Sequence, residues 1–369
     1  MGVNAVTPGG VATRGVGAIV TGAGAVVTGA GTSVTGAVTS VTGAVVAVDG
    51  GGSKTDAVAL GVDGTVLARG RAEGSSPQIL GTERALAVID GLVLRVLAEA
   101  GVDAPAHVHA YLSGLDLPDE TAAFRAALEP LSWVPRDPEA FVVDNDMFAL
   151  LRAGTDEPDA VAVVCGTGIN AVGVRRDGCV VRYPALGMIT GDWGGGWHLG
   201  EQALWHAVRA GDGRGPATLL AELAPGVFGL DRVDELVLAL HRRRIDSNAL
   251  RRLCPTVFEA AARGDEVAGV LVDRQAEEIV TMAATTLRRL ELLDADVPVV
   301  LGGGVIASGD ARLMAGISDG MSHRAPRARL ETVAARPVVG AALLAMDAAG
   351  AAASTLSRVR AEVAAPTLG

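Results

Sequence analysis

Two stretches of this chain run from an apolar strand directly into glycines and then into a second strand. The first is VVAVDGGGSKTDAVAL, residues 45–60, and the second is AVAVVCGTGINAVGV, residues 160–174. Each then continues as a hairpin that closes on an Asp-Gly turn. Because the same strand, turn and strand open both halves of the chain, we expect two duplicated domains that face each other across a cleft.

The length and the order of the predicted elements agree with this division. A chain of 369 residues can build two domains of ordinary size, each with its own core. After each opening hairpin, strands and helices follow, which predicts an α/β fold with mixed sheets. We expect an N-terminal domain over residues 44–156 and a C-terminal domain with a helical insertion over residues 157–336. A helix at about 337–362 is expected to pack back on the first domain.

The first 43 residues are of low complexity, and the tetrapeptide VTGA recurs in them every seven residues from Val20. A seven-residue period is typical of coiled coils, but glycine and β-branched threonine disfavour a helix and no leucine seam is present. Large apolar side chains are too few for a membrane span or for the apolar core of a secretion signal, so neither is favoured. We interpret residues 1–43 as a disordered tail.

Charge and cysteine content narrow the class of partner. The formal net charge is −11, whereas binding to nucleic acid needs a basic face, so we expect no nucleic-acid partner. We expect no membrane partner either. The three cysteines form no CxxC pair and the six histidines show no metal-ligand spacing, which supports neither a disulfide framework nor a zinc site. This pattern favours the reducing cytoplasm.

The first glycine turn is suited to a phosphate group. Backbone N–H groups over residues 50–53 can converge on an anion, because glycine has no Cβ and tolerates positive φ. Asp49, at the end of the preceding strand, could hold Mg²⁺ beside that anion. The spacing excludes a P-loop, since Ser53 stands where glycine is needed and a strand follows the turn. A tight hairpin without a ligand is the alternative.

The second glycine turn, CGTGINA, contains the outline of the dinucleotide fingerprint G-x-G-x-x-A. That fingerprint must open a helix, and here a strand with a hairpin turn follows. A second phosphate turn fits better, with N–H groups from Gly166 and Gly168 and the hydroxyl of Thr167. A plain hairpin is again the alternative.

A third glycine turn, LGGGVIAS, lies between a strand and a capped helix. Without side chains, Gly302, Gly303 and Gly304 would let an adenine or a ribose lie against the backbone. A simple strand-to-helix turn explains the same residues.

Carboxylates at the ends of predicted strands are the candidates for chemistry. Asp144 and Asp146 lie where the ligands of open α/β sheets collect, and a carboxylate there can accept the proton of an attacking hydroxyl. An N-cap on the following helix is the equal alternative. Asp192 precedes a glycine loop and could accept hydrogen bonds from sugar hydroxyls, with Trp193 or Trp197 covering the apolar face of the sugar ring. Alternatively both tryptophans are core and Asp192 is a cap.

Taken in order, these motifs resemble the actin, hexokinase and Hsp70 superfamily of two-domain ATP-binding proteins. More narrowly, they resemble the N-acetylglucosamine kinase branch of the BadF/BadG/BcrA/BcrD ATPase family. DGGGSKTD is similar to the first phosphate motif of that family, CGTGIN to its second and LGGGVIAS to its adenosine motif. The resemblance covers nearly all of residues 45–350. It implies an α/β fold of two ribonuclease H-like (actin-like ATPase) domains with an interdomain cleft.

The resemblance also implies a reaction, the phosphorylation by ATP of N-acetylglucosamine or a related amino sugar at its 6-hydroxyl. The implied cofactors are ATP and Mg²⁺, with Asp146 as the catalytic base and Asp49 as the metal ligand. The implied phosphate-binding residues are Gly50, Gly51, Gly52, Ser53, Lys54, Thr55, Gly166, Thr167 and Gly168, the adenosine-binding residues are Gly302, Gly303 and Gly304, and the sugar-binding residues are Ser76, Gln78, Ser113, Asn170 and Asp192. The expected partner is a small-molecule sugar, and a homodimer is kept open as the assembly.

Three departures from the family pattern bear on the sugar. EGSSPQIL stands where the family has an asparagine, Ile169 replaces a serine, and Trp193 replaces an acidic residue. The alternative function is an ATPase of the same family without sugar kinase activity. Relatives of that kind drive electron transfer through a cysteine-held cluster, and this chain offers no suitable cysteine pair. A sugar-responsive regulator would need a helix-turn-helix, which the tail cannot supply.

Overall fold

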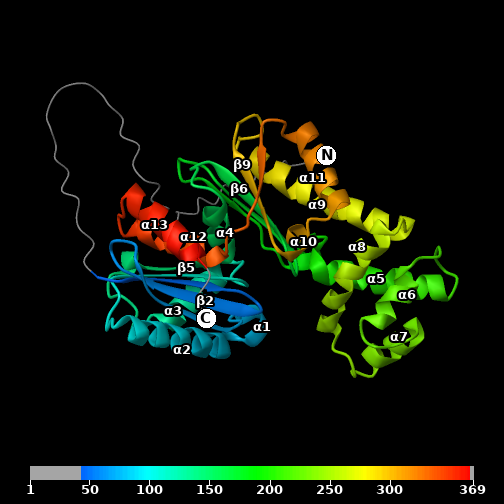
Figure 1. Cartoon of the computed structure of the whole chain (residues 1–369), viewed down its shortest axis with the longest axis horizontal. Helices are drawn as coiled ribbons and strands as arrows, with labels where there is room; N and C mark the ends of the chain where they lie inside the picture. Colours follow the sequence, from blue (N-terminus) through cyan, green and yellow to red (C-terminus); the bar gives the residue numbers. More distant parts are fainter. Residues whose placement is uncertain (1–42, 366–369) are drawn as a thin grey trace, which may run out of the picture.

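The first of two β-sheets is built from the N-terminal third of the chain. The computed structural model describes residues 43–365 (Figure 1). The strands of this sheet are β1 (Val45–Gly50), β2 (Lys54–Leu60), β3 (Val66–Glu73), β4 (His107–Leu112) and β5 (Phe141–Asn145). Their order is β3-β2-β1-β4-β5, with β1 antiparallel to β2 and parallel to β4, and β4 parallel to β5. The carboxyl ends of β1, β4 and β5 therefore lie at one edge.

The second sheet repeats the topology of the first. Its strands are β6 (Ala160–Cys165), β7 (Ile169–Val174), β8 (Val180–Arg182), β9 (Pro298–Gly302) and β10 (Arg329–Thr332). The order β10-β9-β6-β7-β8 matches β5-β4-β1-β2-β3 strand for strand, with β6 antiparallel to β7 and parallel to β9. The duplication predicted from the two glycine turns is thus confirmed.

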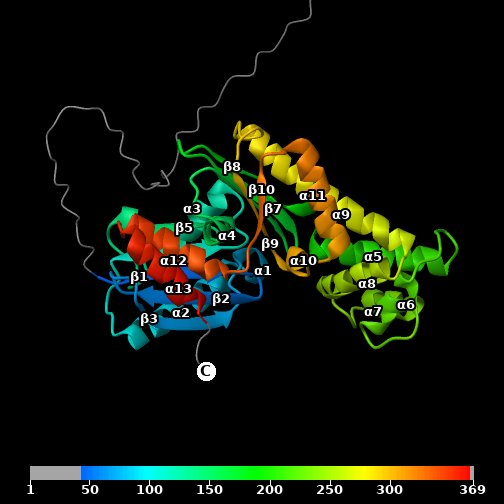
Figure 2. The ribbon, with the colours of Figure 1, turned by 45° about the horizontal axis from the view of Figure 1, so that its top comes forward.

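Helices cover both faces of the first sheet, and two of them lie between it and the second sheet. The helices around the first sheet are α1 (Pro77–Leu80), α2 (Thr82–Ala100), α3 (Pro118–Leu128), η1 (Pro138–Ala140), α4 (Asp146–Gly154) and α12 (Pro337–Ala348). Alternate residues of β1 belong to different cores: Val46 packs with α2 and α3, whereas Ala47 packs with α4 and α12. The second of these cores also contains Ala162 of β6. Helices α4 and α12 therefore join the two halves (Figure 2).

The C-terminal sheet carries a large helical part. Its helices are η2 (Gly187–Ile189), α5 (Gly195–Gly211), α6 (Leu220–Gly226), α7 (Val233–His241), η3 (Ser247–Leu253), α8 (Cys254–Ala262), α9 (Glu266–Arg289), α10 (Gly304–Ala307) and α11 (Ala311–Arg324). Val163 of β6 shares a core with Ile279 of α9 and Ile317 of α11. Helices α5 to α8 extend away from the sheets at one end of the molecule (Figure 2).

The last part of the chain returns to the first sheet. The helix expected at about 337–362 is in fact two helices, α12 and α13 (Ala353–Ala364), because Gly350 takes a φ of +76° between them. From β3, the guanidinium of Arg69 donates to the carbonyl of Ala365 at 2.8 Å. The β2–β3 turn also contacts α13, where Arg358 donates to the carbonyl of Asp63 at 3.2 Å.

Three further sequence expectations concern membrane helices, the N-terminal tail and the cysteines. No helix among residues 43–365 is both long and apolar enough to cross a membrane. The tail predicted for residues 1–43 lies outside the described residues, except for Gly43. The three cysteines are all free.

Candidate active site

Asp49 and Asp146 lie close together at the carboxyl edge of the first sheet. Asp49 is the penultimate residue of β1 and is only 8% exposed. The pKa of Asp49 is raised to about 8, chiefly by burial and then by the negative charges of Asp146 and Asp56, against the positive charges of Lys54 and Arg336. The positive charges of Lys54 and Arg336 thus do not offset the effects of burial and of the neighbouring carboxylates on Asp49.

Asp146 is the first residue of α4, and its neighbour Asn145 caps the helix. Asn145 is the N-cap of α4, and its Oδ1 accepts a hydrogen bond from the backbone N–H of Met147 at 3.0 Å. The alternative in which an aspartate serves as this cap is therefore wrong. Burial, then the charge of Asp116, raises the pKa of Asp146 to about 7, while backbone N–H groups lower it. A carboxyl that titrates near neutrality is suited to accept a proton.

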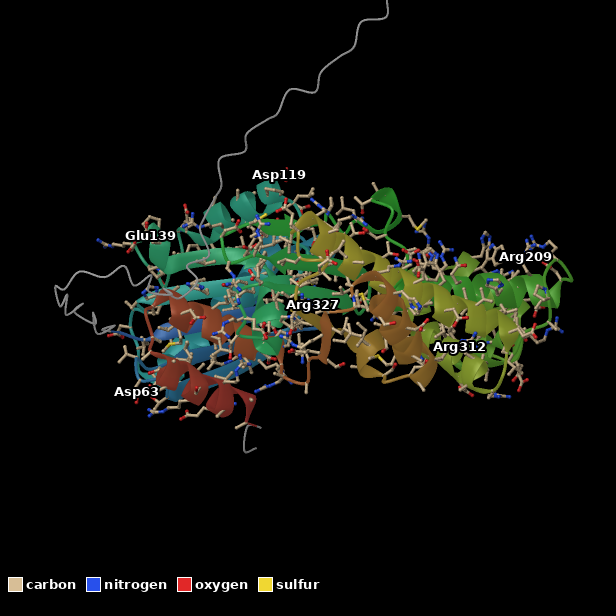
Figure 3. All side chains as sticks on the ribbon, turned by 90° about the horizontal axis from the view of Figure 1, so that it is seen from above. Asp63, Asp119, Glu139, Arg209, Arg312 and Arg327 are labelled. Carbon is tan, nitrogen blue, oxygen red and sulfur yellow. The ribbon has the colours of Figure 1, made fainter. Side chains whose placement is uncertain are left out.

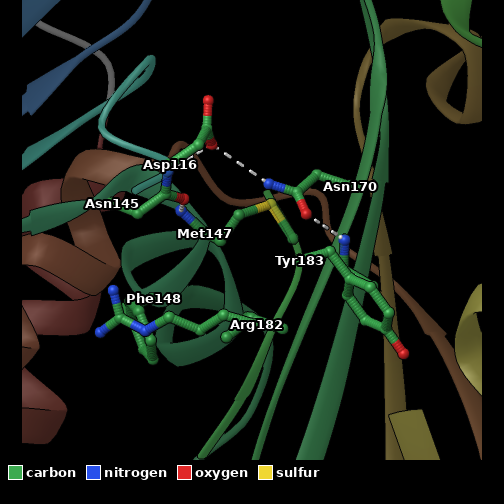
Figure 4. Close-up of a pocket in the computed structure, with 9 residues that line it drawn as sticks. Asp116, Asn145, Met147, Phe148, Asn170, Arg182 and Tyr183 are labelled. Carbon is green, nitrogen blue, oxygen red and sulfur yellow. Dashed lines mark hydrogen bonds between the residues drawn. The ribbon is translucent and has the colours of Figure 1, made fainter. Parts of the chain in front are cut away.

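Asp116 hydrogen-bonds to residues of both sheets; it lies in the segment YLSGLD, whose resemblance to the family implied a sugar-pocket position, but it was not itself predicted as a site residue. It follows β4, and its Oδ1 accepts hydrogen bonds from Asn145 Nδ2 at 2.9 Å and from Asn170 Nδ2 of β7 at 3.4 Å (Figure 4). Burial raises the pKa of Asp116 to about 6 against the hydrogen bond from Asn145, and the charge of Asp192 adds to the rise. The available signal was its position in YLSGLD, close to the predicted Ser113.

Asp144, the other strand-end carboxylate, is engaged in an ion pair between the sheets. Arg182 of β8 donates from Nη1 and Nη2 to its two oxygens at 2.7 and 2.8 Å. The guanidinium also lies over the ring of Phe148, 4.3 Å from its centre. Asp144 therefore holds a structural contact, whereas Asp146 takes part in no ion pair among residues 43–365.

The first glycine turn is exposed at its tip and tightly packed at its base. Residues 52–54 are exposed, and the N–H of Gly51 donates to the carbonyl of Lys54 at 2.8 Å. Positive φ was expected in this turn, but none of the three glycines adopts it. Gly50 is required by close packing instead, because a Cβ there would lie 2.4 Å from Ser75 Oγ and 2.5 Å from Leu112 Cδ2.

Thr55 does not present its side chain to a ligand. It is fully buried, and its hydroxyl lies 2.8 Å from the carbonyl of Glu73 and 2.8 Å from Ser75 Oγ. The Thr55 hydroxyl therefore fixes β2 against the segment that follows β3. Ser53 and Lys54 are the exposed side chains of the turn.

The second and third glycine turns are neighbours in space. Strands β6 and β9 are parallel, with Val164 beside Gly302. Gly303 has a φ of +94°, and a Cβ on it would lie 2.4 Å from the carbonyl of Cys165. Only glycine fits there, so that the backbone before α10 can lie against the end of β6.

The start of α5 closes this cluster of turns. The N–H of Gly196 donates to the carbonyl of Gly166 at 2.7 Å, and the N–H of Trp197 donates to the carbonyl of Thr167 at 3.0 Å. Thr167 and Gly168 remain exposed at the tip. The second glycine turn, the third glycine turn and the start of α5 thus lie together in the second domain.

The predicted sugar-binding residues occupy loops at the same edge. A Cβ on Gly114 would lie 2.7 Å from Ser76 Oγ and 2.8 Å from Gln78 Cβ, so this loop lies against the segment before α1. Ser76 is buried and Gln78 is exposed. The N–H of Ser113 donates to the carbonyl of Gly50 at 2.8 Å, and its buried hydroxyl has no hydrogen-bond partner among residues 43–365.

Asp192 is brought to this region, whereas Trp193 is not available to a sugar. Asp192 accepts a hydrogen bond from Thr190 Oγ1 at 2.5 Å, and its charge acts on Asp116. Trp193 is 5% exposed and packs against His198, with 4.8 Å between ring centres and the rings tilted by 53°. The core alternative is thus correct for Trp193, while Trp197 is half-buried and stays a candidate.

No preformed metal cage is present in the described part of the chain. Among residues 43–365, no three His, Cys, Asp or Glu side chains converge as metal ligands. This agrees with the chemistry of Mg²⁺, which usually takes one or two carboxylates and completes its shell from water and phosphate. Asp49 fits such a site as a single carboxylate.

Comparison with known proteins agrees with this geometry. The sequence model of the BadF/BadG/BcrA/BcrD ATPase family matches residues 46–345. The chain belongs to this family. Its fold is that of the actin-like ATPases, with two ribonuclease H-like domains.

Curated relatives of this family member are sugar kinases. The N-acetyl-D-glucosamine kinase of Dictyostelium discoideum is 27% identical over 80% of this chain and 96% of its own length. The N-acetylmuramic acid/N-acetylglucosamine kinase of Clostridium acetobutylicum is 24% identical over 53% of this chain and 62% of its own length. A solved structure from Chromobacterium violaceum, described as a candidate N-acetylglucosamine kinase, has a TM-score of 0.64 at 24% identity and covers 83% of this chain and 99% of that one.

Proposed function

We propose that this protein transfers the terminal phosphoryl group of ATP to the 6-hydroxyl of N-acetylglucosamine or a related amino sugar. One observation carries the proposal. Asp146 does not cap α4, its pKa is about 7, and it lies beside Asp116, whose carboxylate accepts hydrogen bonds from both sheets. A base and a hydrogen-bonding group that spans both domains are what an acceptor alcohol in a cleft requires. The Dictyostelium discoideum relative supports an amino sugar as that alcohol.

Asp146 is the proposed base. Its carboxylate would accept the proton of the sugar hydroxyl as the oxygen attacks phosphorus, a step that contributes about 10²–10⁴-fold. Asn145 keeps the carboxylate available by capping α4 in its place. Asn170, Asp192, Ser113, Ser76 and Gln78 are the proposed contacts that orient the ring, to which we add Asp116.

Asp49 fits a divalent cation. Burial disfavours the ionised form of this carboxyl, whose pKa is about 8, so a nearby positive charge would stabilise the carboxylate. Bound Mg²⁺ supplies charge neutralisation for a transferring phosphoryl group. Arg336 and Lys54 are the cations of this chain that already act on Asp49, and they would favour phosphate at the same place.

The glycine turns are the proposed nucleotide contacts. Backbone N–H groups at the exposed tips of the first two turns, residues 52–54 and 167–168, would hold phosphate oxygens, and residues 302–304 would lie along the adenosine. The packing of Gly303 on the end of β6 supports this division, because it brings the third turn beside the second. We assign residues 44–156 to the first domain and residues 157–336 to the second. We also assign the protein to the cytosol, which its three free cysteines support.

An ADP-release assay tests the function. The purified chain is supplied with ATP, Mg²⁺ and, in turn, N-acetylglucosamine, glucosamine, N-acetylmannosamine and glucose. We expect an amino sugar to give the highest kcat/KM, and ³¹P NMR of the product to show the phosphate on O6. A rate that is the same with all four sugars and without any sugar contradicts the proposal and leaves an ATPase.

A further inference from the structure

The proposed sugar end of the site is strongly acidic. Asp116 lies between Asn145 and Asn170 and faces the charges of Glu120 and Asp192, which raise its pKa. Glu120 is held in place there, since its Oε2 accepts the N–H of Asp116 itself at 3.2 Å. Asp116 acts in turn on Asp146. Asp116 thus lines the pocket, and the carboxylates of Glu120, Asp146 and Asp192 lie within electrostatic reach of it.

The cation that lines this pocket is already paired. Among the residues that line it, Arg182 is the one with a positive charge. Both of its terminal nitrogens are bonded to the carboxylate of Asp144, at 2.7 and 2.8 Å. Its side chain extends beside Phe148, away from Asp116 and Asn170 (Figure 4). A ligand that binds at Asp116 therefore finds no free guanidinium on this wall.

The cation that lies over Trp193 is paired as well. Arg274 pairs with Glu278, with 3.7 Å between Nε and Oε1, and Glu278 itself lies within the influence of Asp192. Lys54 and Arg336 act on Asp49, at the proposed nucleotide end. The two ends of the site thus differ in charge: cations gather where phosphate would bind, and acids where the sugar would bind.

We propose that this pocket selects uncharged and cationic amino sugars and rejects those that carry a carboxylate, such as N-acetylmuramic acid. The inference rests on the proposed sugar kinase function and narrows its substrate class. Family membership does not decide the point, because the Clostridium acetobutylicum relative is named for both N-acetylmuramic acid and N-acetylglucosamine. A carboxylate that enters the pocket meets the like charge of Asp116, while Arg182, the cation that lines the pocket, is already paired with Asp144; both penalise binding.

The test separates charge from size. The full chain is assayed for ADP release with N-acetylglucosamine, glucosamine, N-acetylmuramic acid and the methyl ester of N-acetylmuramic acid, which keeps the bulk of the acid without its charge. We expect kcat/KM for the acid to be at least about 100-fold below that for N-acetylglucosamine, and about tenfold or more below that for the ester. The ratio of acid to ester should rise with salt, because salt screens repulsion and leaves size unchanged.

Two variants of the ion pair move that ratio in opposite directions. Asp144→Asn removes a negative charge and frees Arg182, so the ratio of acid to ester rises several-fold. Arg182→Gln leaves Asp144 unpaired, so the ratio falls. Glu139→Gln, in the exposed η1 that precedes β5 (Figure 3), removes one charge at the opposite edge of the sheet from Asp116 and leaves the ratio unchanged. Melting temperatures establish that each variant is folded.

The possible outcomes test this inference separately from the proposed kinase function on which it rests. If the acid and the ester react equally well at low salt while N-acetylglucosamine is phosphorylated, the charge selection is overturned and the kinase function stands. If both variants leave the ratio at the wild-type value, the role of the Asp144–Arg182 pair is overturned. If no sugar releases ADP, the kinase function falls and the inference falls with it.

Discussion

The side-chain amide of Asn170 donates to the carboxylate of Asp116 at 3.4 Å, across the space between the two sheets. Asp116 follows β4 of the first sheet, and Asn170 is the second residue of β7 of the second. The same carboxylate oxygen accepts the amide of Asn145 at 2.9 Å. A sugar held by this group would contact both domains at once, so its binding and the relative position of the domains would be coupled.

Asn170→Ala should weaken sugar binding more than it slows chemistry. The variant removes one contact to the ring and leaves Asp146 in place, so we expect KM for the sugar to rise about tenfold, as for one lost hydrogen bond to a charged group. We expect kcat to fall less. Initial rates over a range of sugar concentrations measure both constants. Asn248→Ala, an exposed asparagine of η3, is the matched control.

Asp146→Asn should abolish turnover while ATP still binds. The amide keeps the shape of the carboxyl but cannot accept a proton, so kcat should fall by at least about 100-fold. Calorimetry with a non-hydrolysable ATP analogue should give an affinity close to that of the unmodified protein. Turnover within a few-fold of normal would remove Asp146 from the role of base.

The stability of the ligand-free protein should fall as pH rises through neutrality. The folded pKa values of Asp49 and Asp146, about 8 and about 7, lie above the ordinary value of 3.8. The folded state therefore binds more protons than the unfolded state between about pH 4 and pH 8, and stability falls over that range. Asp49→Asn should melt higher than the unmodified protein at pH 8 and show little difference at pH 4.

Thermal melts across this pH range check the sign, with Asp119→Asn as the control for the loss of a surface carboxylate. Equal changes in melting temperature for both variants at every pH would mean that burial does not disturb the pKa of Asp49. Addition of Mg²⁺ with an ATP analogue should reduce the fall in stability, since a ligand that binds only the folded state stabilises it.

The architecture was largely predictable because it rests on local patterns. Apolar runs that end in glycines and restart as strands appear in the sequence at residues 45 and 160, and the topology repeats accordingly. The bounds of α2 were also clear, because Thr82 opens the apolar period and Gly101 ends the helix in the left-handed conformation. The division of the last helix at Gly350 was missed, since alanines on both sides favour a continuous helix.

Side-chain orientation at the site was less predictable. The run Asp144, Asn145, Asp146 offers three good N-caps in succession, and propensity does not choose among them. The orientation of Thr55 could not be read from alternation, because β2 is buried on both faces after its first residue. The contact between Asp116 and Asn170 depends on how the two sheets meet, and this arrangement cannot be predicted from the sequence around either residue.

Gly50→Ala should destabilise the protein, although the backbone at this position is one that alanine can adopt. A Cβ at Gly50 would lie 2.4 Å from Ser75 Oγ and 2.5 Å from Leu112 Cδ2. Since both neighbours are buried, the extra methyl group should cost about 1–3 kcal/mol of folding free energy. We expect a lower melting temperature and a weakened affinity for ATP, because Ser75 also bonds to Thr55 behind the first turn.

The matched control is Gly91→Ala in the middle of α2, where a Cβ would meet nothing within 4 Å. Alanine there should stabilise the helix by roughly 0.5–1 kcal/mol. Urea unfolding of the two variants measures both effects, and opposite signs are expected. If Gly50→Ala were as stable as the unmodified protein, the base of the first turn would have room for a side chain. The close packing of β1, β4 and the Ser75 segment would then not be what keeps glycine at this position.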